Sequence, residues 1–425
     1  MSAPPSEEAR AFESALRANP HDLAGWCAYA DWLTEQGDPR GEFMQVQLAL
    51  EDETRSKSER AALKEREAEF LKAHEREWLG EELGEFLLAN RDEPDRYDPI
   101  NPVYEWRRGF LWELVIGELD ADTAQALAHT PAARMLQALR VHGVGEHRPI
   151  APGAPNPPGV DRYSPLFELI GSPLLDNLRV FQYGPEVADE SLTGDQWQNM
   201  ARFDCWTYHP GLEHVIGSMS RVEELHLFCK QYDIGAVFGA MSLPNLRVLR
   251  VYHLGTRDSR SEREGYAYPL GILAANPAMS NLTHLLFHPH HEEYSSASYP
   301  DLDCFLPLSA LQALTGSPHL TKLTHLQFRL SNMGDEGARE IVRSGLLKRL
   351  KWLDLRHGCV TDEGARALAE CPDLRNLGHL DLSRNMVTDV GLNLLKQTGT
   401  NVRADYPLTD AEIEEQVYLF EGDSE

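Results

Sequence analysis

The residues with the most reactive side chains are scattered along the chain and form no established catalytic pattern. The sequence contains no phosphate-binding loop of the G-x-x-x-x-G-K-[ST] kind, no dinucleotide-binding glycine pattern, no G-x-S-x-G and no H-E-x-x-H. Cys205 and His209 are four residues apart, as a thiol nucleophile and its base could be, but a buried structural cysteine explains the pair more simply. We therefore predict a protein that is not an enzyme and uses no cofactor.

A second group of reactive residues is the segment 288–293, which contains His288, His290, His291, Glu292 and Glu293. Imidazole and carboxylate groups are ligands for zinc or nickel. Adjacent residues in a loop rarely converge on one ion, and no second ligand group is identifiable, so a solvated loop competes with this interpretation. A metal-binding or enzymatic factor that uses this segment is the alternative to a non-catalytic protein.

Three near-copies of one unit organise the chain between residues 326 and 395. Each opens with a short alternating segment, at 326–328, 353–355 and 380–382, so the copies begin 27 residues apart. The outer two residues of each segment face inward if it is a strand. A polar turn follows, then Asp335, Asp362 or Asp389, where an acid would cap the free N–H groups of a helix start. An apolar helical run completes the unit.

One strand and one helix cannot bury this apolar surface, whereas stacked copies can. The pattern resembles leucine-rich repeats of the ribonuclease-inhibitor-like kind, which repeat about every 20–29 residues. The resemblance implies an α/β solenoid over residues 108–403, with parallel strands on its concave face, helices on its convex face and a role in protein recognition. Insertions at 143–164, 255–268 and 288–300 follow strands and are either a recognition rim or neutral loops.

The first 56 residues predict a small all-helical domain. Ser6 suits a helix start, Asn19-Pro20 a helix end, and the sequence GDP at 37–39 a break. Within this domain stand Asp31-Trp32-Leu33, Glu35, Gly37-Asp38, Arg40-Gly41-Glu42-Phe43 and the run 45–48. The segment resembles the repeat-companion domain at the amino end of certain bacterial leucine-rich-repeat proteins, which implies a bacterial origin. We expect its aromatic residues to form a core, residues 57–107 to be a helical connector or cap, and residues 404–425 to be an acidic cap or tail.

Charge and composition argue against several classes of function. The formal net charge is −27, from 40 basic and 67 acidic residues, which opposes general binding to nucleic acid or anionic membranes. The six cysteines lack the spacing of a disulfide framework, the first residues lack the pattern of a signal peptide, and no apolar run is long enough to span a membrane. We predict a cytoplasmic protein with reduced thiols.

The strand pattern predicts which side chains point out of the concave face. The predicted partner-binding set consists of arginine, histidine and aromatic residues: Arg140, His142, Arg179, Phe181, His226, Phe228, Arg250, Tyr252, His288, Arg329 and Arg356. Arginine and aromatic side chains are enriched at binding hot spots. Alternatively, the aromatic side chains pack on one another and the arginines pair with acids of neighbouring repeats. We predict that this face binds a protein partner, with an acidic surface as one suitable partner, and that the chain is an adaptor, inhibitor or regulatory subunit.

Two other occupants of this face follow from the same pattern. The segment 404–425 has eight acids and no Lys, Arg or His, so it could cover the face of its own solenoid. RNA could contact the arginine and aromatic side chains by stacking and through its phosphates, although the net charge opposes this.

Overall fold

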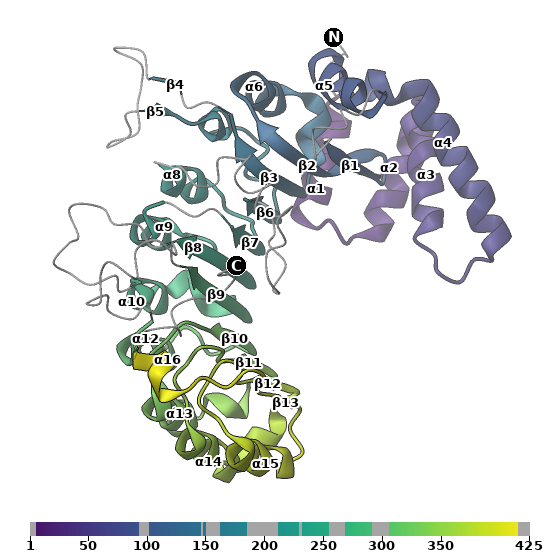
Figure 1. Cartoon of the computed structure of the whole chain (residues 1–425). Coiled ribbons are helices and arrows are strands. Elements are labelled where there is room, and N and C mark those ends of the chain that lie inside the picture. The colour runs from purple at the N-terminus through teal and green to yellow at the C-terminus, as the bar shows by residue number, and fades with distance from the viewer. Residues whose placement is uncertain are drawn as a thin grey trace. The chain divides into compact units, whose positions relative to one another are not determined.

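A computed structural model describes residues 6–92, 102–145, 148–149, 162–184, 211–228, 232–254, 268–290 and 306–414 (Figure 1). For residues 89–92, 148–149, 162–163, 252–254, 288–290 and 413–414 it describes the backbone alone. The chain divides into two compact units, which we describe separately. Unit 1 comprises Met1–His147 and Ser164–Val180, and unit 2 comprises Arg148–Tyr163 and Phe181–Glu425.

Unit 1 begins with five helices: α1 (Glu7–Ala18), α2 (Leu23–Glu35), α3 (Pro39–Leu50), α4 (Lys57–Leu79) and α5 (Glu81–Asp92). The local sequence explains their starts. The side chain of Ser6 accepts a hydrogen bond from the backbone of Ala9 and caps α1, as predicted. Asp38 caps α3, whose first residue is Pro39. Ser56 and Glu59 form a capping box at the start of α4.

The helices of unit 1 pack against a hairpin of strands β1 (Val103–Arg107) and β2 (Phe110–Leu119). β1 pairs antiparallel with β2, and β2 pairs parallel with β3 (Ala138–Val144), which follows α6 (Ala121–His129). Trp26, Tyr29 and Phe43 are buried, which confirms the prediction that the aromatic residues of the opening segment are core. The helical segment and the first strands therefore share one hydrophobic core.

Unit 2 is a series of strands and helices that alternate along the chain. Its strands follow the chain order β6 (Val180–Tyr183), β7 (Glu224–Leu227), β8 (Val248–Leu254), β9 (His284–His290), β10 (His325–Phe328), β11 (Trp352–Asp354), β12 (His379–Asp381) and β13 (Val402–Arg403). Its helices are α8 (Leu212–Gly217), α9 (Ile234–Ala240), α10 (Leu270–Ala275), α12 (Leu308–Thr315), α13 (Gly334–Arg343), α14 (Asp362–Glu370), α15 (Asp389–Gln397) and α16 (Asp410–Glu414). A separate antiparallel pair, β4 (Arg148–Pro149) and β5 (Arg162–Tyr163), belongs to the first insertion.

Figure 1 shows helices α8 to α15 along one side of unit 2 and the strands along the other. From β7 to β13 the described pairs are parallel. Leu326, Leu353 and Leu380 stand opposite one another in adjacent strands, so the 27-residue offset read from the sequence is the register of the sheet. The predicted solenoid of stacked strand–helix units is confirmed.

The aspartates at the helix starts act between repeats, which differs from the sequence-based expectation. The caps of α14 and α15 are Thr361 and Thr388. Asp335 instead accepts hydrogen bonds from Thr361 and from the backbone N–H of Gly364, in the next repeat. Asp362 makes the same contacts with the repeat that follows it. Each acid therefore fixes the helix start of the following repeat.

This contact requires a glycine in the following repeat, at Gly364 for Asp335 and at Gly391 for Asp362. A Cβ atom at Gly364 would lie 2.5 Å from Oδ1 of Asp335, closer than any real contact. Glycine therefore lets the carboxylate reach the backbone N–H groups at the start of the next helix. The D-E-G and D-V-G sequences thus encode stacking between repeats.

We expect the acid to stabilise unit 2 only where another repeat follows. Asp335→Ala and Asp362→Ala should each lower the free energy of unfolding by about 1–2 kcal/mol, because each leaves N–H donors of the next helix start without their acceptor. Asp389→Ala is the matched control, because α15 is the last helix of this series, and its effect should stay below about 0.5 kcal/mol. Urea unfolding of the three variants measures the difference; equal losses at all three positions would contradict this role.

Candidate functional site

The register of the sheet identifies three outward positions in every repeat of unit 2. The first lies immediately before the first inward residue and is occupied in adjacent strands by Val248, His284, His325, Trp352 and His379. The second lies between the two inward residues and holds Arg250, Leu286, Gln327, Asp354 and Asp381. The third follows the second inward residue. We call the surface formed by these side chains the strand face.

One predicted site residue lies inside the core. Phe181 is 0% exposed, and Tyr183 is buried with it, so both side chains of β6 face inward. The expectation that Phe181 points outward is wrong, because β6 begins at Val180 and its first inward residue is Phe181 rather than Leu178. Leu178 lies in the turn before β6, where its backbone N–H donates to the carbonyl of Leu174. The outward residue of this strand is therefore Gln182.

The predicted residues of unit 1 have partners within unit 1. Nε of Arg140 lies 2.8 Å from a carboxylate oxygen of Glu113. Nη2 of Arg179 donates to the backbone carbonyl of Arg17 at the end of α1, at 3.2 Å. His142 is partly buried, and burial followed by the charge of Arg140 lowers the pKa of its imidazole. Arg140 is therefore paired with a carboxylate and protonation of His142 is disfavoured, whereas Arg179 donates to a neutral carbonyl.

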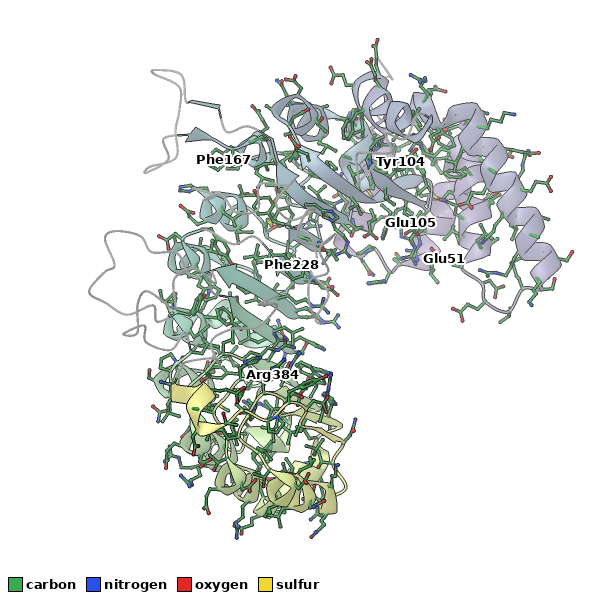
Figure 2. The ribbon with its side chains drawn as sticks, viewed as in Figure 1. Glu51, Tyr104, Glu105, Phe167, Phe228 and Arg384 are labelled. Atoms are coloured by element: carbon green, nitrogen blue, oxygen red, sulfur yellow. The ribbon has the colours of Figure 1, made fainter. Side chains whose placement is uncertain are left out.

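Phe228 and His226 stand at the outward positions of β7 but are largely covered. Phe228, labelled in Figure 2 at the end of β7, is 8% exposed, and its ring meets that of His226 edge-on with centroids 5.8 Å apart. Arg250 is partly exposed. The side chains of Tyr252 and His288 lie outside the described residues, as do Cys205, His209 and the loop 291–293. The predicted metal segment therefore has no described ligand geometry.

Arg329 and Arg356 belong to a row of ion pairs that we call the ion-pair row. Arg329 is 0% exposed and its guanidinium lies 2.5 Å from Asp354. Arg356 lies 2.9 Å from the same carboxylate and 3.6 Å from Asp381 in the next strand. The alternative that arginines pair with acids of neighbouring repeats is the arrangement observed here. Removing one member would leave a buried charge uncompensated.

We expect Asp354 to be among the most sensitive positions of unit 2. Asp354→Ala should lower the free energy of unfolding by about 3–5 kcal/mol, because Arg329 would keep a buried positive charge without its carboxylate. Asp405→Ala removes an exposed acid that pairs with Arg403 at 2.6 Å and should cost less than about 1 kcal/mol. Chemical denaturation compares the two, and similar small losses would show that the ion-pair row is not a structural element.

A row of stacked rings occupies the first outward position, and sequence reasoning missed it. The imidazoles of His284 and His325 are stacked, with centroids 3.9 Å apart and planes inclined by 13°. Trp352 and His379 continue the row, stacked at 6.0 Å and 18°. All four side chains are partly exposed. We call these four residues the His–Trp ladder.

A threonine immediately before His284 and another before His325 orient these two rings of the ladder. The hydroxyl of Thr283 lies 2.8 Å from Nδ1 of His284, and the hydroxyl of Thr324 lies 2.9 Å from Nδ1 of His325. The sequence signal for this row is Thr-His immediately before the strand leucine, repeated at 283–284 and 324–325. The two outward positions considered in the sequence begin one residue after that leucine, so they omit the ladder.

The surroundings of His284 and His325 disfavour protonation of their imidazoles. Burial, followed by the neighbouring charges of His325, Arg247 and Arg250, lowers the pKa of His284, which Glu224 partly offsets. Burial also lowers the pKa of His325. At neutral pH the two stacked rings are therefore neutral, and the row presents flat aromatic faces.

These shifts predict a pH-dependent contribution to stability. Because the folded-state pKa values lie below the ordinary value of about 6.5, the unfolded chain binds these protons at higher pH. The contribution of the two histidines should fall as the pH drops from 7.5 towards 5. His284→Gln with His325→Gln should therefore gain stability relative to the parent chain over this range, by about 1 kcal/mol. Urea midpoints at both pH values test this, with exposed His129→Gln as control; a pH-independent difference would refute it.

Two segments of unit 2 match a known family of repeats. Residues 319–342 and 350–369, which contain β10 with most of α13 and β11 with most of α14, match a family model described as Leucine Rich repeat. These segments are leucine-rich repeats. No curated protein matches the sequence. The matched residues include His325 and Trp352 of the His–Trp ladder and Arg329, Asp354 and Arg356 of the ion-pair row.

Two solved structures are similar to the chain. A Bacteroides fragilis protein is 9% identical, with a TM-score of 0.36, over 67% of this chain and 71% of that one. An internalin from Listeria monocytogenes is 15% identical, with a TM-score of 0.28, over 77% of this chain and 95% of that one.

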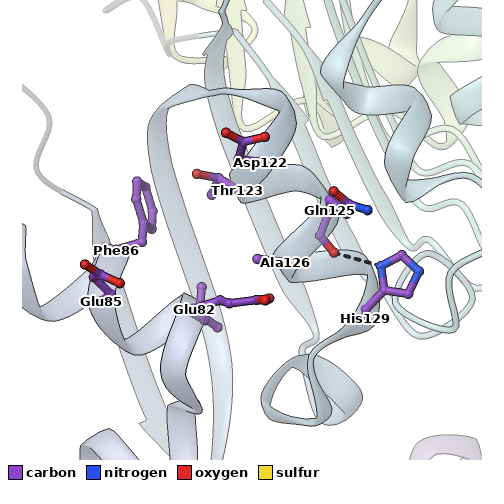
Figure 3. A pocket seen from close by; sticks show the side chains of 9 residues that line it. Glu82, Glu85, Phe86, Asp122, Thr123, Gln125, Ala126 and His129 are labelled. Carbon is purple, nitrogen blue, oxygen red and sulfur yellow. Dashed lines mark hydrogen bonds between the residues drawn. The ribbon is translucent and has the colours of Figure 1, made fainter.

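Three further observations concern metal ions, membrane-spanning helices and a cavity in unit 1. The described residues contain no group of three or more His, Cys, Asp or Glu side chains placed to hold a metal ion. Among the same residues, no helix combines the length and apolar character needed to cross a membrane. A cavity of about 660 Å³ in unit 1, between α5 and α6, is lined by Glu82, Glu85 and Asp122 (Figure 3). Its lining is acidic, with Phe86 beside it, and it holds no feature that identifies a ligand.

Proposed function

We propose that this chain is a non-catalytic protein-binding protein whose partner contacts the strand face of unit 2 at the His–Trp ladder. The supporting observation is a row of stacked, partly exposed rings on a rigid parallel sheet. Aromatic side chains that are already ordered lose little conformational entropy when a partner covers them. Leucine-rich repeats are commonly used for protein recognition, which agrees with this proposal.

The chemistry of the partner follows from the charges on this face. Arg329 and Arg356 are engaged in ion pairs, and the stacked imidazoles of His284 and His325 are neutral at pH 7. A flat apolar or aromatic surface with hydrogen-bonding groups therefore suits the ladder better than the strongly acidic surface considered from the sequence. By binding such a partner, this chain would act as an adaptor, inhibitor or regulatory subunit of one specific protein.

Two sequence features support the cellular setting that we propose. Among the described residues, Cys27, Cys359 and Cys371 form no disulfide, which agrees with a reducing cytoplasm. The resemblance of the opening segment to the repeat-companion domain supports a bacterial origin. RNA binding gains no support from the described strand face, because the arginines in ion pairs are not available to phosphates without losing their carboxylates.

The test is a quantitative affinity purification from the native cell. Trp352→Ala with His325→Ala should reduce the amount of specifically retained partner by about thirtyfold, because it removes about 2 kcal/mol of hot-spot contact. Val390→Ala, on the exposed surface of α15, is the matched control and should retain the partner. Circular dichroism melting checks that both variants fold. Unchanged retention by the folded ladder variant would exclude this face as the interface.

A further inference from the structure

A second cavity in unit 1 has a chemistry opposite to that of the acidic one. It has a volume of about 510 Å³ and lies among helices α1 to α4 and the turn at Pro131. The side chains that decide its character are Tyr29, Trp32, Trp78, Arg40 and Arg134. The volume is within the range of about 300–1,000 Å³ that is usual for small-molecule sites. Its lining combines flat aromatic rings with two guanidinium groups.

Arg40 is a buried cation at this cavity. Its side chain is held by the backbone carbonyl of Gly109, which accepts a hydrogen bond from Nη1 at 2.9 Å. Its guanidinium carbon lies 5.0 Å from the ring centre of Trp78 and 5.1 Å from that of Phe110. The residue is 8% exposed. Among the described residues Arg40 takes part in no ion pair, although a buried charge ordinarily has a paired carboxylate.

The acids near Arg40 have other hydrogen-bond partners. Glu13 accepts hydrogen bonds from Tyr29 at 2.8 Å and from Arg134 at 2.9 Å. Asp38 accepts from the backbone N–H of Arg40 and so caps α3. Glu8 and Glu77 on the lining are exposed, and Glu77 faces His74. None of these carboxylates is within ion-pair distance of the Arg40 guanidinium in the described chain.

The surroundings of Arg40 disfavour the charged form of its guanidinium group. Burial, followed by the positive charge of Arg134, lowers the pKa of Arg40 to about 10, and Asp38 only partly opposes this. An anion placed between the two guanidinium groups would relieve both effects, because Arg presents a fork of N–H donors that matches an oxyanion. The aromatic rings would contact the rest of such a ligand.

We propose that this cavity in the helical part of unit 1 binds a small ligand that carries a carboxylate or phosphate group on a flat aromatic body. The oxyanion contacts Arg40, with Arg134 beside it, and the body lies against Trp32 and Trp78. The site is separate from the strand face of unit 2, so its test is independent of the proposed partner binding. This site would give residues of α2 and α3 a ligand-binding role that does not involve the strand face.

The experiment titrates the full-length chain with phenylacetate and with phenyl phosphate, and with inorganic phosphate as a probe that lacks the aromatic body. Thermal melting and the intrinsic fluorescence of tryptophan measure binding. We expect phenylacetate or phenyl phosphate to raise the melting temperature in a saturable manner and to bind at least tenfold more tightly than inorganic phosphate. The preferred probe distinguishes a carboxylate from a phosphate ligand.

Arg40→Met separates a ligand-binding arginine from a structural one. A structural arginine would destabilise the protein when replaced, whereas a buried charge without an ion pair can be replaced by an apolar side chain at little cost. We expect the Arg40→Met variant to melt within a few degrees of the parent chain and to bind the probes at least tenfold more weakly. Arg66→Met is the matched control, because Arg66 is exposed and lies away from the cavity, and it should bind normally.

A second variant keeps the proposal testable if Arg40→Met does not fold. Trp32→Ala removes a partly exposed ring at the cavity and should weaken the aromatic probes at least fivefold with folding retained. Binding that is unaffected by both Arg40→Met and Trp32→Ala would overturn the proposal. So would the absence of saturable binding of either aromatic probe at tens of millimolar.

Discussion

The structure of unit 2 depends on the contact between each repeat and the next. Leu326, Leu353 and Leu380 stand opposite one another in register and close the core, and no single strand–helix unit could bury them alone. The hydrogen bonds that Asp335 and Asp362 accept from the following helix starts fix the same register from the helix side. Because the parallel strands pair in register, side chains at one position of each repeat are brought into a row. The ion-pair row and the His–Trp ladder are consequences of this stacking.

The two rows show different ways of using an outward position. In the ion-pair row, Arg329 and Asp354 neutralise each other and are buried, so this part of the strand face joins adjacent repeats. In the His–Trp ladder, the rings stack along the sheet and keep their faces partly exposed. A recognition surface needs polar groups that are still available for hydrogen bonds, or side-chain area that is exposed to solvent. By that criterion the ladder is the more suitable site.

Much of this fold follows from the sequence, and the exceptions have physical causes. The inward leucines, the 27-residue offset and the cap at Ser6 depend on local pattern, which the sequence displays directly. Phe181 was misplaced because Leu178 and Phe181 are both apolar and only the sheet register decides which residue begins the strand. The pairing of Arg329 with Asp354 depends on residues 25 positions apart that meet across strands. Such pairs cannot be read from composition, although the order of the repeats makes them plausible candidates.

The opening helices contact the first strands through the tip of a hairpin. The turn between β1 and β2 is formed by Arg108 and Gly109, both with left-handed backbone, and its tip enters the helical segment. Arg108 is held by Glu51 through two hydrogen bonds of 2.8 and 2.7 Å. Burial alone would raise the pKa of Glu51, but the hydrogen bonds from Arg108 and Arg107 lower it.

The hairpin tip therefore completes the fold of the helical segment. Gln47 donates to the carbonyl of Trp106 and accepts from the N–H of Gly109, so the strand turn has its polar groups satisfied by helix α3. The carbonyl of Gly109 in turn positions Arg40 at the cavity. A boundary placed at residue 56 or 107 would separate Arg40 from the group that orients it. The helices and the first strands lie in one compact unit, and the hairpin tip orients Arg40, a residue that lines the cavity.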